Sequence, residues 1–89
     1  MMNKRKGLQL VNITRSHHSG TEGRVEVSYN IIFRINGVTS TASTSHHTLT
    51  GVAGRQMVND ALRDEVNDVL DQIGFLKPTR TKAVRRYCR

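Results

Sequence analysis

Residues 24–47 read RVEVSYNIIFRINGVTSTASTSHH, and this stretch decides the fold. Apolar side chains occupy every second position over residues 24–35, a period of two that predicts a strand with one buried face. Asn36-Gly37 follows at once and supplies the positive φ angles that a two-residue type I′ turn requires. We therefore expect residues 38–47 to return antiparallel to the first strand.

This turn fixes the pairing of the two strands. On the covered face it sets Phe33 opposite Ser40 and, continued to the far end, Val27 opposite His46. Large side chains thus face small ones, which leaves room for a helix. The other face is expected to be rich in hydroxyl groups and weakly charged.

The sequence before the hairpin predicts a shorter strand over residues 8–15. Leu8 and Leu10 share one parity, whereas Val11 and Ile13 share the other, and such a shift indicates a β-bulge or an edge strand. The segment SHHSGTEG, residues 16–23, is expected to be the loop that joins this strand to the hairpin.

A single amphipathic helix is predicted after the hairpin. Thr50 can cap it, Gly74 can end it with a left-handed residue, and Pro78 prevents its continuation. Its apolar residues recur at spacings of three and four and form one stripe: Val58, Ala61, Leu62, Val66, Val69, Leu70 and Ile73.

The expected fold class is α+β, a three-stranded antiparallel meander covered on one face by one C-terminal helix (βββα). The predicted organisation is a basic arm (residues 1–6), one small domain (residues 7–76) and a basic C-terminal tail (residues 77–89), with both ends flexible. This order resembles the double-stranded-RNA-binding domain and the sheet-plus-helix modules of integrase arm-binding domains and plant-type AP2 domains. No helix precedes the strands here, and Arg24 and Arg34 stand amid Ser and Thr on the outer face, so no functional residue is transferred from either family.

Positive charge is concentrated at the two ends of the chain. Residues 1–6 and 77–89 hold nine of the fourteen basic residues and no acid. The stretch between them carries five basic residues against seven acids, a formal charge of −2, although the whole chain has a net charge of +7. Attraction to a polyanion is therefore expected to come from the ends.

The basic ends predict contacts with phosphates, and Tyr87 is available to stack on a base. Arg24 and Arg34 are possible additional contacts. An acidic protein surface, intramolecular docking on the helix and a merely solubilising tail are the alternatives. The residues predicted to bind nucleic acid are Lys4, Arg5, Lys6, Lys77, Arg80, Lys82, Arg85, Arg86, Tyr87 and Arg89.

Four aspartates line the helix face opposite the apolar stripe: Asp60, Asp64, Asp68 and Asp71. They are either a solvated face or a docking strip for a basic partner, including the tail of a second copy. Carboxylates spread along a helix in this way do not converge on a metal.

The histidines form two adjacent pairs, His17-His18 and His46-His47, which the predicted pairing gathers at one end of the sheet. Zinc ligation is one interpretation, but neighbours on a strand point to opposite faces, so polar strand-end residues are the default and no metal is expected. The glycines of residues 51–54 indicate either a phosphate site or, by preference, a tight strand-to-helix turn.

No catalytic arrangement of Ser, His, Asp or Cys stands out, so an enzyme is not expected, and neither is a cofactor or a small-molecule substrate. Cys88 has basic neighbours that would lower its thiol pKa, but it lies in the predicted flexible tail. A single cysteine and the absence of a long apolar run indicate a reducing, cytoplasmic location without membrane contact. So short a chain also favours a homodimer.

The leading hypothesis is a small non-enzymatic accessory or regulatory protein that binds nucleic acid or a nucleoprotein through its basic ends. The alternative is a small inhibitor or adaptor of the kind encoded by phages and mobile elements. Such a protein would bind a host protein through the sheet edge, the acidic helix face or the basic tail.

Overall fold

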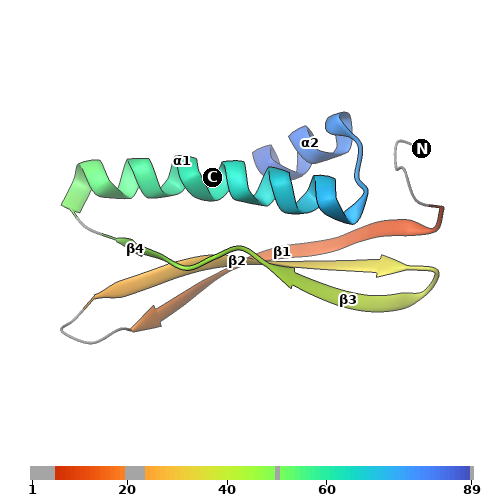
Figure 1. The fold of residues 1–89 in the computed structure, drawn as a ribbon, viewed down its shortest axis with the longest axis horizontal. Coiled ribbons are helices and arrows are strands. Elements are labelled where there is room, and N and C mark those ends of the chain that lie inside the picture. Colours follow the sequence, from red (N-terminus) through yellow and green to blue (C-terminus); the bar gives the residue numbers. More distant parts are fainter. Residues whose placement is uncertain (1–5, 20–23, 50, 89) are drawn as a thin grey trace.

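The computed structural model describes residues 6–19, 24–49 and 51–88, with the backbone alone for residues 51–54. Both helices lie on the same side of an antiparallel sheet, and the opposite side carries no helix of the described chain (Figure 1). The fold is α+β, as expected. Its elements in chain order are β1 (Leu8–Ser19), β2 (Val25–Ile35), β3 (Val38–Ser43), β4 (His47–Leu49), α1 (Gly51–Ile73) and α2 (Lys77–Tyr87).

The predicted hairpin is present with the predicted turn. Asn36 and Gly37 have φ angles of 50° and 83°, the left-handed values that this turn needs. The pairing of β2 with β3 runs from Ile35 opposite Val38 to Asn30 opposite Ser43, as expected. β2 lies at the centre of the sheet because β1 pairs with one of its edges and β3, then β4, with the other.

The returning strand is not continuous, however. β3 ends at Ser43, and β4 pairs with β2 one residue out of the expected register, so that His47 and not His46 lies opposite Val27. Thr44 explains the shift: its backbone N–H donates to Tyr29 O (3.0 Å), and its hydroxyl accepts from Tyr29 N (2.9 Å). A side-chain oxygen thus replaces a backbone acceptor, and the strand gains one residue without leaving the buried Tyr29 amide unsatisfied.

β1 contains the predicted irregularity but is longer than expected. The register shifts between Leu10 and Asn12, which confirms a bulge at Val11. The prediction of a loop from Ser16 was wrong, because β1 continues to Ser19 and pairs with β2 to its end. Polar contacts on the open face stabilise this extension, among them a hydrogen bond from the Asn30 side chain to Ser16 Oγ.

The long helix matches the prediction. In α1 the apolar stripe contributes Leu62, Val66, Leu70 and Ile73 to the core. Gly74 ends the helix with a φ of 124°, and the N–H groups of Gly74 and Phe75 both donate to Leu70 O (3.1 and 3.0 Å). The proposed cap Thr50 lies outside the described residues.

The expectation of one helix and a flexible basic tail was wrong, since residues 77–87 form a second helix. Pro78, which stops α1 from continuing, sits in the first turn of α2, where a missing N–H costs nothing. α2 buries Ala83 and is followed by Cys88, which is only 4% exposed, and Tyr87 packs partly against the same core. The sequence did not indicate this helix, because its few buried residues are small or aromatic and stand among basic ones.

One hydrophobic core holds these layers together. Val27, Tyr29, Ile31 and Phe33 of β2 belong to it, together with the buried residues of the α1 stripe, Phe75 and Ala83 of α2. No described helix is long and apolar enough to cross a membrane.

Candidate functional site

The two faces of α2 differ sharply in character. Towards the core, Ala83 is buried and Tyr87 is half-buried. Lysine and arginine side chains cover the outward side, and the helix contains no acid. Four of the cations predicted to contact phosphate are exposed on this one short element, and we call them the basic face: Lys77, Lys82, Arg85 and Arg86.

Arg80 has a structural position instead. Its Nε donates to Asn67 Oδ1 (3.1 Å), and its Nη1 donates to Phe75 O (2.7 Å) and to Asp71 Oδ1 (3.1 Å). The side chain is only 14% exposed. Arg80 therefore fixes α2 against α1 and orients the basic face, and it is not presented with the other cations.

The ring of Tyr87 is also in contact with another side chain. The guanidinium carbon of Arg86 lies 5.4 Å from the centroid of its ring, a cation–π contact. Lys6, the one described cation of the N-terminal segment, is exposed just before β1. Lys4, Arg5 and Arg89, which the sequence also predicted to bind nucleic acid, lie outside the described residues. Arg24 and Arg34 are exposed at opposite ends of β2, and Arg34 lines a cavity together with Thr79 of α2.

The acidic strip on α1 is exposed but partly neutralised. Asp60 pairs with Arg63 (2.8 Å) and Asp71 with Arg80 (3.1 Å). Within the described part of the chain, Asp64 and Asp68 have no ion-pair partner. Negative charge therefore remains in the middle of α1.

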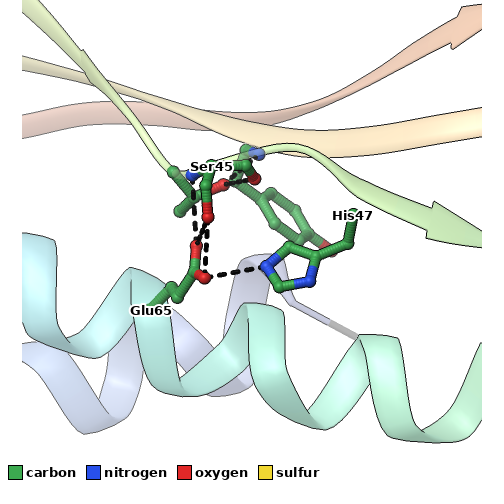
Figure 2. A network of polar contacts seen from close by, with 5 residues as sticks. Ser45, His47 and Glu65 are labelled. Atoms are coloured by element: carbon green, nitrogen blue, oxygen red, sulfur yellow. Dashed lines mark hydrogen bonds and ion pairs between the residues drawn. The ribbon is translucent and has the colours of Figure 1, made fainter.

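A polar network joins α1 to the irregular segment between β3 and β4 (Figure 2). Glu65 accepts hydrogen bonds from the backbone N–H of Ser45 (3.1 Å) and from its hydroxyl (2.8 Å), and its Oε1 lies 2.7 Å from His47 Nε2. Because a carboxylate only accepts hydrogen bonds, His47 Nε2 carries a proton in this contact.

Glu65 is the common partner of Ser45 and His47 in this network. The Ser45 hydroxyl donates to the carboxylate of Glu65, and no hydrogen bond between Ser45 and His47 is present among the described residues. Partial burial raises the pKa of the Glu65 carboxyl, but the hydrogen bonds from His47 and Ser45 outweigh it and keep the pKa below its ordinary value. Sequence reasoning missed Glu65. Glu65 directly follows Asp64 of the aspartate strip and therefore projects from α1 beside that strip, towards the sheet. This position was the signal from which its contact with the sheet could have been predicted.

The histidines gather at one end of the sheet in separate contacts. The rings of His18 and His46 stack with centroids 4.8 Å apart, and His46 Nδ1 lies 3.8 Å from Glu26. His47 faces the helix, whereas His46 and His18 meet elsewhere. Over residues 6–19, 24–49 and 51–88, no group of three or more potential metal ligands comes together.

Cys88 is enclosed beside the sheet. Burial raises the pKa of its thiol, although Arg63, Tyr29 and Arg15 partly oppose this. Arg63 also donates from Nε to Cys88 O (3.0 Å), which ties the end of α2 to α1. The expectation of a lowered pKa in a flexible tail was wrong, because burial outweighs the nearby cations.

No protein-family model, curated protein sequence or solved structure matches this chain. The functional argument therefore rests on the geometry above.

Proposed function

We propose that this chain is a small non-enzymatic accessory protein that binds nucleic acid through the basic face of α2. The observation that carries the proposal is the separation of residue types on that helix. Four cations are exposed on one side, and the other side packs into the core. A helix fixed in this way presents its charges with less loss of conformational freedom than a disordered tail would.

The chemistry of the basic face suits the phosphate backbone. Lysine and arginine neutralise phosphates and release counterions, which makes binding depend steeply on salt. Contacts made predominantly to phosphates carry no direct sequence information, so weak sequence preference is expected. Lys4, Arg5, Lys6 and Arg89 remain predicted phosphate contacts from the sequence alone.

Charge neutralisation is the appropriate test, because deleting residues 77–89 would also remove Ala83 and Cys88 from the core. The Lys82→Gln, Arg86→Gln double variant should bind a labelled DNA duplex more weakly than the unchanged protein in fluorescence anisotropy. The slope of log affinity against log salt should become shallower by about two, one for each cation that no longer neutralises a phosphate.

The control is the Asp64→Asn, Asp68→Asn variant, which removes two charges of the opposite sign from α1. It should bind the duplex at least as tightly as the unchanged protein. Equal affinity of the Lys82→Gln, Arg86→Gln variant and the unchanged protein at low salt would overturn the proposal. The rival function, binding of a host protein through the acidic face, would gain support if Asp64→Lys, Asp68→Lys abolished biological activity while duplex binding was absent.

A further inference from the structure

β1 is an edge strand with an open side. It pairs with β2 alone, and no strand of the described residues pairs with its outer edge. An unpaired edge presents backbone N–H and C=O groups on which another extended chain can form hydrogen bonds. Val11, at the bulge, is 43% exposed on this strand.

A groove runs between β1 and α2. A cavity of about 490 Å³ is lined by residues of β1 on both sides of the strand, by Arg34 and Phe75, and by Thr79 of α2. A second cavity of about 210 Å³ continues along α2 past Lys82, Arg86 and Tyr87. Leu10 and Thr79 line both cavities, so the two are adjacent, and together we call them the groove.

The groove combines an apolar floor with positive walls. Leu10, Phe75 and Ala83 supply apolar surface, whereas Arg34, Lys82 and Arg86 supply charge, and none of the residues lining the two cavities is acidic. α2 has eleven residues. At about 1.5 Å per residue, such a helix flanks about five residues of an extended chain rising about 3.3 Å each.

We propose that this groove binds an extended acidic peptide segment of a partner protein, which adds to the sheet beside β1. Its backbone pairs with the edge of β1 around the bulge. Its Asp or Glu side chains, at every second position, face the helix side and meet Lys82 and Arg86, and the side chains between them point to the other side of the sheet. Because both helices lie on one side of the sheet, only every second side chain of an added strand faces α2, and a segment in which acidic residues alternate with apolar ones meets this condition (Figure 1).

Other occupants fit the groove less well. A second copy added edge to edge through β1 would bring two basic faces near each other with no acid lining either groove. Nucleic acid offers phosphates to the cations but has no peptide groups to pair with a strand edge. An acidic peptide satisfies both the edge and the charge.

The test uses matched neutralisations on the same helix. The probe is a synthetic peptide of alternating valine and glutamate, about ten residues long so that it overhangs the groove. It should bind the unchanged protein in isothermal titration calorimetry. Lys82→Gln, Arg86→Gln should weaken this binding at least tenfold, whereas Lys77→Gln, Arg85→Gln, which removes the same charge away from the groove, should change it less than twofold.

Backbone pairing is tested on the ligand, where it cannot disturb the fold. N-methylation of alternate residues of the peptide, in each of the two possible phases, should abolish binding in one phase, because one set of N–H groups faces β1. Equal loss of affinity in the two double variants, or full binding by both methylated peptides, would overturn the proposal. Absence of any binding by the unmodified peptide would overturn it as well.

The outcome is separable from that of the nucleic-acid function. Both double variants should lose affinity for a DNA duplex, since all four cations belong to the basic face. Only the pair that lines the groove should lose affinity for the peptide.

Discussion

At the scale of single residues, the side chains of Thr44 and Glu65 determine how the returning strand pairs with β2 and how it is joined to α1. Thr44 uses its hydroxyl to satisfy the buried amide of Tyr29, which allows the register of the returning strand to shift by one residue. The shift turns His47 towards α1, where Glu65 binds it together with Ser45. These residues therefore join the sheet to the helix that covers it.

Thr44→Val tests the role of the hydroxyl. Valine has the same shape but no acceptor, so the buried Tyr29 N–H loses its partner, and the free energy of unfolding should fall by about 1–3 kcal/mol. Urea denaturation followed by circular dichroism measures the change. Thr44→Ser keeps the hydroxyl and should recover most of the loss. Equal stabilities of the valine and serine variants would contradict the assignment.

Glu65→Gln tests the network through its pH dependence. Because the folded-state pKa of Glu65 lies below its ordinary value of 4.5, its contribution to stability is present above that pH and is lost as pH falls through the folded-state pKa. The variant should be less stable than the unchanged protein at neutral pH, by about 1 kcal/mol. The difference should shrink once the pH is lowered well below 4.5. A difference that stays constant with pH would show that the ionised carboxylate is not the stabilising species.

At the scale of whole elements, predictability followed the strength of the hydrophobic pattern. The β2–β3 hairpin and α1 were predicted because an unbroken period of two, an Asn-Gly turn and a long apolar stripe each allow one local structure. The break at Thr44 was missed because a side chain replaced a backbone acceptor, and strand periodicity does not report this. The pairing of residues 16–19 depends on contacts across the sheet that are distant in sequence.

α2 was missed for a different reason. Its buried positions are an alanine, a half-buried tyrosine and the cysteine beyond its end, all weak signals among basic residues. For the candidate site, the identity of the cations was therefore predictable, but their common face was not. Arg80 was removed from the set only by the position of its partners on α1.

Ala83→Asp tests the docking of α2. The substitution places a charge in the core, so α2 should separate from the sheet and expose Cys88. Ellman's reagent measures this: the thiol of the unchanged protein should react slowly, since it is buried with a raised pKa, and that of the variant should react at least about tenfold faster. Thr81→Asp adds the same charge at an exposed position of α2 and should leave the rate nearly unchanged. Fast reaction in the unchanged protein would contradict the packing of Cys88.

Over the whole molecule, the helices lie on one side of the sheet, and the two helices differ in charge. The helices cover one side of the sheet, and the other side carries no helix of the described chain (Figure 1). The exposed cations of α2 stand on a helix without acids, whereas Asp64 and Asp68 are exposed on α1, and Asp64 and Arg85 line one common cavity. The proposed nucleic-acid function relies on the attraction of a polyanion to the exposed cations of α2. The homodimer that the chain length favours stays a prediction.

The most direct test of the nucleic-acid function is the salt dependence of duplex binding by the unchanged protein, measured by anisotropy from about 50 to 200 mM salt. Four phosphate contacts from the basic face predict a slope of log affinity against log salt of about −3.6 or steeper. Salt-independent binding, or no binding at the lowest salt, would contradict the proposal that this basic face binds nucleic acid.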